Sequence, residues 1–268
     1  MPFSIATWNI NSVRLRIDLV TRFLKEQAPD VLCLQETKCP DGQFPAGEFA
    51  KAGYKHHAIN GQKGYHGVAI VSRHPFAATT RRDFCEKGDS RHIAATIGGK
   101  AKGLTVHSLY VPAGGDEPDP AINDKFAHKL AFVDEMAAWF KKEKTGASRA
   151  VLVGDLNIAP EEHDVWSHKA LLDVVSHTPI EVEKFVKARA AGDWHDALRH
   201  FTPSEKKLYT WWSYRSPDWN AADKGRRLDH VWVSKDLAPK LKSMAVHRDV
   251  RGWERPSDHA PVVVTMTV

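Results

Sequence analysis

Short apolar runs alternate with amphipathic stretches along the whole chain. The apolar runs predict β-strands, because a buried strand reads as about four to eight mainly apolar residues between turn signals. The predicted strands cover residues 3–9, 31–36, 66–72, 92–98, 104–111, 150–155, 209–214, 228–234 and 261–268. The polar, Gly- and Pro-rich segment 112–120 predicts a loop.

Two stretches carry apolar residues at helical spacing. The first stripe consists of Val13, Ile17, Val20 and Leu24. The second consists of Phe126, Leu130, Val133, Ala137 and Phe140. We expect Ser12 to cap the first helix and Pro29 to end it, and residues 180–200 to be mostly helical. Because strands and helices interleave without a linker, we predict one α/β domain over residues 1–268, with some antiparallel pairing.

Composition narrows the class of protein. The 268 residues are 42% hydrophobic and 26% charged, which is typical of a globular protein. No apolar run approaches the roughly 20 residues that span a bilayer, and the first residues do not resemble a secretory signal. The three cysteines form no CxxC pair, so we expect neither a disulfide framework nor a zinc knuckle, and we expect a cytoplasmic location. The formal net charge of +5 permits a polyanionic partner.

The end of one apolar run raises the question of chemistry. Val151 to Val153 predict a buried strand, and Asp155 and Asn157 follow Gly154. Residues two apart share one side of a strand, so both polar side chains would project together from its carboxyl end, where ligands gather in α/β proteins. These residue types also form ordinary turns, and the motif alone favours a turn.

The same pattern recurs at other predicted strand ends, which favours one shared functional rim. The polar residues at these ends are Asn9, Asn11, Glu36, Tyr110, Asp155, Asn157, Asp229, Asp258 and His259. Carboxylate and amide oxygens suit a hard cation such as Mg²⁺ or Mn²⁺, whereas zinc prefers Cys or more His. A remaining carboxylate can accept a proton from water, and His and Tyr can donate to phosphate oxygens. This inventory predicts metal-assisted attack of water on a phosphodiester.

An ordered set of motifs resembles a known family. TWNIN, LQETK, YVP, GDLN, RLDHVWVS and SDHAP occur in the order found in the exonuclease III type of apurinic/apyrimidinic endonuclease, within the endonuclease/exonuclease/phosphatase superfamily. GQKGYHGVAI and TWWSYRS resemble the exonuclease III branch, and the match runs from about residue 4 to residue 266. The resemblance implies a DNase I-like, four-layer sandwich of two packed mixed β-sheets flanked by helices.

The resemblance also implies roles for the residues at the rim. Glu36 would be the principal metal ligand, with Asp258 and Asn11 nearby. Asn9 would orient these ligands. Asp155 would activate water, Asn157 would hold that water or stabilise the transition state, and both would lie beside the metal. Tyr110 and His259 would contact the scissile phosphate, and Asp229 would orient His259. The alternatives are an ordinary strand tyrosine at Tyr110, a plain turn at Asp258, and a surface salt bridge between Asp229 and Arg227.

The implied partner is double-stranded DNA with abasic sites or 3′ ends. We expect the protein to act as a monomer and to have no membrane partner. By resemblance, Lys63, Arg91 and Arg215 would contact phosphates, together with His259. Trp211 and Leu228 would line a pocket for a baseless sugar. Arg226 stands where relatives often have an apolar or aromatic residue, and Ala113 stands where an amide is expected. We count Arg226 among the DNA-contacting residues.

The implied activity is a Mg²⁺-dependent DNA repair nuclease, with Mn²⁺ able to substitute. It would cut 5′ to abasic sites and trim 3′ ends of duplex DNA. Two other functions remain open at this point: a phosphodiesterase of the same fold that acts on RNA, phosphoinositide or sphingolipid, and a nucleic-acid-binding module without catalysis. The sequence leaves open the balance of endonuclease and exonuclease activity. It also leaves open whether the site holds one metal ion or two.

Overall fold

Two mixed β-sheets form the centre of the molecule, whose computed structural model describes residues 2–268. The first sheet has the order β13 (Leu241–Val246), β14 (Val262–Thr267), β1 (Pro2–Asn9), β2 (Val31–Gln35), β4 (Val68–Ser72), β3 (His56–Asn60). The second has the order β5 (Phe76–Arg81), β6 (His92–Ile97), β7 (Thr105–Tyr110), β8 (Ala150–Asp155), β12 (Asp229–Val233), β9 (His195–Asp196). Each sheet contains one parallel pair, β1–β2 and β7–β8, and its other pairs are antiparallel.

Side-chain alternation explains why the two sheets pack face to face. In β1, Phe3 and Ile5 belong to a cluster that also contains Val151 and Val231 of the second sheet. Ala6 and Trp8, which point the opposite way, belong to a separate cluster on the outer face. Because successive strand side chains point to opposite faces, one face of each strand fills the space between the sheets and the other meets the helices.

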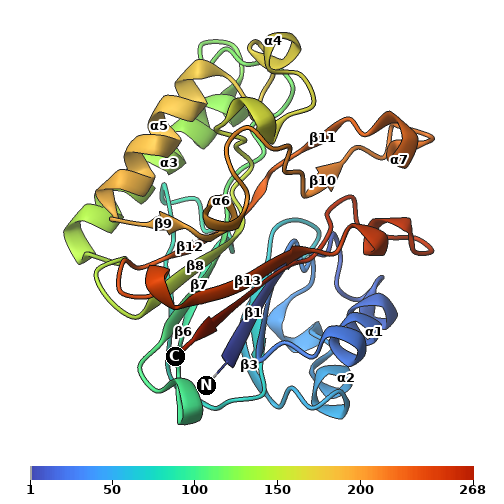
Figure 1. Cartoon of the computed structure of the whole chain (residues 1–268), viewed down its shortest axis with the longest axis vertical. Helices are drawn as coiled ribbons and strands as arrows, with labels where there is room; N and C mark the ends of the chain where they lie inside the picture. The colour runs from blue at the N-terminus through green and yellow to red at the C-terminus, as the bar shows by residue number, and fades with distance from the viewer. Residues whose placement is uncertain (1) are drawn as a thin grey trace.

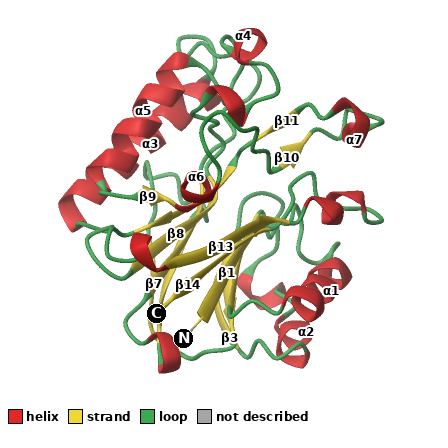
Figure 2. Ribbon diagram, viewed as in Figure 1, coloured by secondary structure: helices red, strands yellow, loops and turns green. Residues whose placement is uncertain are grey.

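Helices cover both outer faces, which completes four layers (Figure 2). On the first sheet lie α1 (Ile17–Gln27) and α2 (Ala46–Lys51), and on the second lie α3 (Asp124–Glu143) and α5 (Pro179–Ala191). Shorter helices are α4 (His168–Leu171), α6 (Ala197–Phe201) and α7 (Trp219–Ala222). The predicted four-layer architecture is confirmed. Within residues 2–268, no helix combines the length and apolar character needed to cross a membrane.

A short two-stranded ribbon projects from the sandwich (Figure 1). It pairs β10 (Trp211–Trp212) with β11 (Gly225–Arg226), and α7 lies in the connection between them. Trp211 lies opposite Arg226 on one side and forms an isolated antiparallel bridge with His259 on the other. The ribbon is therefore joined to the chain that precedes β14.

The structure corrects several local predictions. Ser12 does not cap α1: the helix begins at Ile17 after Arg16, and no side chain caps it. The Ser12 amide instead donates to the Glu36 carbonyl at 2.7 Å. Only two residues of the predicted strand 209–214 are strand, and the stretch 180–200 is interrupted between α5 and α6. The strands β3, β5, β9, β11 and β13 were not predicted, and β5 and β13 expose much of their surface.

Candidate active site

Strand polarity brings the predicted polar residues to one edge of the two sheets. Asn9 ends β1, and Glu36 follows its parallel neighbour β2. Tyr110 ends β7 and lies opposite Asp155 at the end of the parallel β8. Asp229 begins the antiparallel β12 and also lies opposite Asp155. The carboxyl ends of the parallel strands and the amino end of β12 therefore meet at one rim.

Gly154 explains how two strands approach each other directly beneath this rim. Its φ is 146°, and a Cβ at this position would lie 1.9 Å from the Leu109 carbonyl oxygen. Any larger residue would push β7 away from β8, since that contact is with backbone. The glycine thus permits the pairing of Tyr110 with Asp155.

A single side-chain amide connects the two sheets at the rim. Asn9 Nδ2 donates to Glu36 Oε1 at 2.9 Å and to Asp155 Oδ2 at 2.8 Å. Glu36 Oε1 also accepts a hydrogen bond from the Tyr110 hydroxyl at 2.8 Å. The Ser257 hydroxyl supports Asn9 by donating to its backbone carbonyl oxygen at 2.6 Å. The carboxylates of Glu36 and Asp155 are therefore held as one group, although they lie far apart in sequence.

The surroundings of Glu36 favour its charged form. Burial raises the pKa of Glu36, but Lys38 beside it and the hydrogen bonds from Asn9 and Tyr110 outweigh burial, so the pKa falls below its usual value. Burial and the Glu36 carboxylate raise the pKa of Tyr110 well above its usual value, so its hydroxyl stays protonated. Tyr110 consequently acts as a donor here.

An oxygen-rich position beside Glu36 fits a hard cation. The Lys38 ammonium lies 2.8 Å from Glu36 Oε2 and 2.6 Å from Asn11 Oδ1, which identifies a position where two oxygens favour positive charge. Asp258 lines the same cavity as Glu36 and accepts a hydrogen bond from Trp211 Nε1 at 2.9 Å. Carboxylate and amide oxygens are the ligands that Mg²⁺ and Mn²⁺ prefer.

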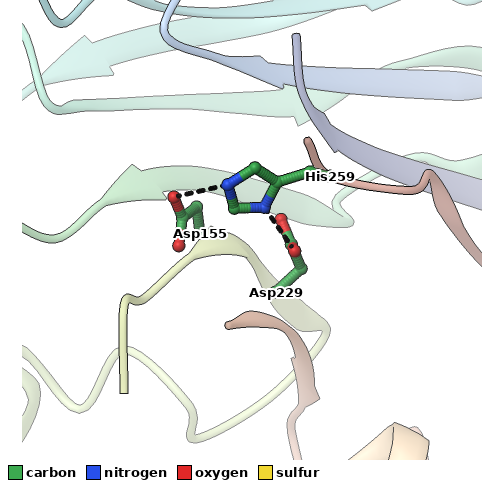
Figure 3. A group of neighbouring side chains, drawn as sticks. All are labelled: Asp155, Asp229 and His259. Atoms are coloured by element: carbon green, nitrogen blue, oxygen red, sulfur yellow. Dashed lines mark hydrogen bonds and ion pairs between the residues drawn. The ribbon is translucent and has the colours of Figure 1, made fainter. Parts of the chain in front are cut away.

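Asp155, His259 and Asp229 form a buried chain of acid, imidazole and acid (Figure 3). His259 Nδ1 lies 2.8 Å from Asp229 Oδ2, and its Nε2 lies 3.6 Å from Asp155 Oδ2. Burial lowers the pKa of His259, but the two carboxylates outweigh it and raise the pKa above the usual value. The imidazolium is therefore favoured.

The same three residues present another arrangement of metal-binding groups. Their potential ligand atoms all lie within 4.8 Å of one another. However, a metal held by Asp229 and His259 Nδ1 would have to replace their hydrogen bond. Burial raises the pKa of Asp155, although His259 opposes this effect. A buried carboxylate beside an imidazolium is suited to exchanging a proton.

Asn157 is fixed beside Asp155 by its own hydrogen bonds. Its Nδ2 donates to Asp155 Oδ2 at 3.2 Å and to the Val111 carbonyl at 2.9 Å. Both amide hydrogens are thereby used, which leaves Oδ1 as the group that can accept a hydrogen bond from water. The φ of Asn157 is 52°, a left-handed conformation that asparagine tolerates better than most residues.

A cavity of about 760 Å³ opens in front of these groups. Its reactive lining includes Glu36, Tyr110, Asp155, Asn157, Asp258 and His259. A second wall consists of Trp166, Val174, Val175, Trp211, Arg226 and Leu228. Trp211 faces this space, whereas its neighbour Trp212 is buried in a core cluster. Ala113 and Arg215 also line the cavity.

Two of the predicted phosphate-contacting residues do not line this cavity. Lys63 is exposed on the loop before β4. Arg91 is only 6% exposed, and its Nε donates to Asp89 at 2.9 Å. The Arg91 guanidinium also lies 4.9 Å from the Tyr110 ring, so this geometry favours support of Tyr110. Direct DNA contact by Lys63 or Arg91 stays a prediction.

Buried groups that sequence reasoning missed hold the loops around the cavity. Lys129 of α3 is fully buried and donates to the carbonyl oxygens of Asn157 at 2.7 Å and Ala113 at 3.1 Å. Its ammonium also pairs with Glu181 at 2.5 Å. The available signal was its position three residues after Phe126, on the apolar stripe of the predicted helix. Lys38, within the LQETK motif, was also not assigned a role.

The comparisons with known proteins agree with this geometry. The endonuclease/exonuclease/phosphatase family model matches residues 6–259. Exodeoxyribonuclease III of Haemophilus influenzae is 31% identical over 265 residues, which cover 96% of this chain and 97% of the relative. An AP endonuclease structure from Archaeoglobus fulgidus has a TM-score of 0.90 and 31% identity, covering 99% of this chain and 100% of that one. A Neisseria 3′ phosphatase bound to product DNA hairpin has a TM-score of 0.88 and 32% identity, covering 98% of each chain. The chain described here belongs to the endonuclease/exonuclease/phosphatase family.

Proposed function

We propose that this chain is a divalent-metal-dependent DNA repair nuclease that cuts 5′ to abasic sites and removes 3′ nucleotides or blocking groups from duplex DNA. The observation that carries the proposal is the bridge from Asn9 to both Glu36 and Asp155. This bridge joins a cation-binding carboxylate to a buried acid–imidazole chain within one cavity. Metal-assisted phosphodiester hydrolysis requires both functions within reach of one phosphate.

Glu36 would hold Mg²⁺, with Asp258 and Asn11 completing the oxygen ligands directly or through water, and Mn²⁺ would substitute. Asn9 orients Glu36 by donating to its Oε1 at 2.9 Å. When bound, the cation supplies a positive charge that polarises a phosphate oxygen and neutralises developing negative charge.

The remaining groups would move protons and stabilise charge. Asp155 accepts a proton from the attacking water, which Asn157 Oδ1 orients by accepting its second hydrogen. As the water oxygen bonds to phosphorus, the bond from phosphorus to the 3′ oxygen of the preceding nucleotide breaks, and that oxygen takes up a proton from solvent. The imidazolium of His259 donates toward a phosphate oxygen, and Asp229 keeps that ring oriented through the 2.8 Å bond at Nδ1. Tyr110 donates its hydroxyl in the same region. These donors stabilise the charge that develops on the phosphate.

The second wall of the cavity supports an abasic sugar as the group recognised. Trp211 and the buried Leu228 offer apolar surface against which a deoxyribose without a base could pack. Extruding a sugar from the duplex is easiest where no base is stacked. Exposed Lys63 and Arg215 would contact backbone phosphates, and the net charge of +5 favours this polyanion.

The direct test uses purified protein, Mg²⁺ and a duplex that carries one tetrahydrofuran abasic analogue. We expect cleavage on the 5′ side of the analogue, abolished by EDTA and by Glu36→Ala. RNA, phosphoinositide and sphingomyelin, assayed in parallel, should turn over far more slowly than the abasic duplex. Binding without hydrolysis, or cleavage that persists in EDTA, would reject the proposal.

Glu36→Gln should raise the Mg²⁺ concentration that gives half-maximal activity. The substitution removes one negative charge while keeping the side-chain shape. We expect a shift of at least about tenfold, because altering even the partners of metal ligands typically weakens affinity by about 10–100-fold. A Mg²⁺ titration of initial rate measures the shift, and an unchanged titration curve would contradict the assignment of Glu36.

Tyr110→Phe should lower turnover by roughly 10–100-fold. A hydrogen bond to a charged group contributes about 1.5–3 kcal/mol, and the hydroxyl that donates to Glu36 at 2.8 Å would be lost. Single-turnover rates at saturating protein measure the effect, and urea denaturation verifies folding. Turnover within about twofold of wild type would return Tyr110 to the role of a packing residue.

Three further properties belong to the same proposal. Both sheets contribute to the site, which supports a single domain over residues 1–268. A monomer suffices for the proposed chemistry, because all its groups come from one chain. Cys33, Cys39 and Cys85 are free thiols, which supports a reducing, cytoplasmic environment.

A further inference from the structure

Three side chains form a row that leads away from the reactive groups. Trp211 lies directly opposite Arg226 in the β10–β11 ribbon, and it also bridges to His259. Directly paired residues on neighbouring strands project from the same face, and neighbouring strands lie roughly 5 Å apart. The row therefore runs from His259 through Trp211 to Arg226, and all three side chains line the same cavity.

The guanidinium of Arg226 is held in place at the end of this row. Its Nη1 donates to the Val175 carbonyl at 2.9 Å and to Ser176 Oγ at 2.7 Å. Its Cζ lies 5.4 Å from the centre of the Trp211 ring. These contacts orient the planar group before any ligand arrives, and such orientation lowers the entropic cost of binding.

The charge of Arg226 has no carboxylate partner within residues 2–268. The neighbouring Glu181 carboxylate pairs with Lys129 instead, at 2.5 Å. The Arg226 Nε is buried without a hydrogen-bond partner in this described part of the chain, and its Nη2 makes no hydrogen bond there. An oriented, half-buried guanidinium with unused donors is suited to an anion, because it can form charge-assisted bonds to phosphate oxygens.

We propose that Arg226 binds the phosphate on the 3′ side of the abasic sugar whose 5′ phosphate is cleaved. This inference rests on the proposed function, in which His259 meets the scissile phosphate and Trp211 meets the sugar. The next phosphate along the DNA strand then lies beyond Trp211, beside Arg226. Arg226 is thus a specificity residue for internal sites, because a 3′-terminal nucleotide with a free hydroxyl has no phosphate at that position.

The test compares two duplexes that differ in one linkage. Both carry a tetrahydrofuran abasic analogue, followed on its 3′ side by either a normal phosphodiester or an uncharged methylphosphonate. For wild-type protein we expect kcat/KM to be about tenfold or more higher with the phosphodiester. Arg226→Gln keeps an amide donor for the Val175 carbonyl but removes the charge, and we expect the ratio between the two duplexes to approach one.

Two further variants separate charge recognition from loop support. Arg226→Lys keeps the charge and should retain part of the preference. Arg215→Gln is the matched control: Arg215 is an exposed arginine on the same cavity, so its loss should slow both duplexes alike and preserve the ratio.

The outcomes distinguish this inference from the proposed function. An equal loss on both duplexes in Arg226→Gln would mean that Arg226 only supports the loop containing Val175. Faster cleavage of the abasic duplex by Arg226→Gln would mean that the guanidinium obstructs the sugar. Either result would overturn the inference while leaving the nuclease proposal intact. The nuclease proposal itself would fail if wild-type protein cleaved neither duplex.

Discussion

Replacing Asp155 by asparagine should reduce turnover on an abasic duplex by about 10²–10⁴-fold, the range that a positioned general base contributes. The amide cannot accept the proton from water. It would still fill the space beside Asn157 and His259, so DNA affinity should change little. Single-turnover rates give the effect on chemistry, and fluorescence anisotropy with the same duplex gives the affinity.

The control for Asp155→Asn is Asp134→Asn. Asp134 is an exposed carboxylate on α3 that pairs with Lys184 at 2.6 Å, away from the cavity. This control should keep both turnover and affinity close to wild type. If Asp155→Asn instead lowered turnover and DNA affinity by the same factor, Asp155 would position the substrate rather than activate water.

Replacing Arg227 by methionine should lower the free energy of unfolding by about 3–5 kcal/mol, the range for removing one partner from a buried ion pair. Arg227 is fully buried, and its Nε and Nη2 bond to Asp164 at 2.7 and 2.8 Å. Its Nη1 bonds to Asp196 at 2.7 Å. Without Arg227, these two carboxylates would remain buried with less compensating charge. Urea denaturation with both m-value and midpoint measures the loss.

The control for Arg227→Met is Lys187→Met, which removes an exposed pair with Glu183. That pair is solvent-accessible on both sides, so its loss should leave the free energy of unfolding close to that of wild type. A result for Arg227→Met as small as that of the control would contradict the described role of the buried cluster.

The same cluster makes a specific contribution to stability in acid. Burial raises the pKa of Asp196, but Arg227 outweighs burial and lowers the pKa to about 2. A carboxyl whose folded pKa lies below its unfolded value of about 3.9 stabilises the fold above that unfolded value. This contribution is lost as pH falls from about 4 to about 2. Arg227→Met should therefore show a weaker loss of stability over that interval.

Periodicity predicted the central strands and the stripe of α3 because burial on a strand or helix face leaves a direct trace in the order of residues. The rim was also predictable, since polar residues at Asn9, Glu36 and Asp155 interrupt runs that are otherwise buried. The edge strands β5 and β13 left a weaker trace because much of their surface meets solvent. Their pairing is set by neighbours that lie elsewhere in the chain.

The partners of buried charges could not be inferred from order alone. The order of residues offers Arg227 as a surface partner for Asp229, yet Arg227 bonds to Asp164 and Asp196. Asp229 instead bonds to His259. Partner choice depends on which loops the folded sheets bring together, and sequence separation does not encode that distance. Similarly, only the register of the β10–β11 ribbon aligns Arg226 with Trp211.

The most direct test of the central claim is a crystal structure of the protein with Mn²⁺, whose anomalous scattering locates the ion. We expect a cation in the cavity with a Glu36 oxygen at about 2.1 Å, as for Mg²⁺, and with oxygens of Asp258 or Asn11 completing the shell directly or through water. Asp155 should remain hydrogen-bonded to Asn9 across the two sheets. A cation held by Asp155, Asp229 and His259, with Glu36 left out of its coordination, would contradict the account.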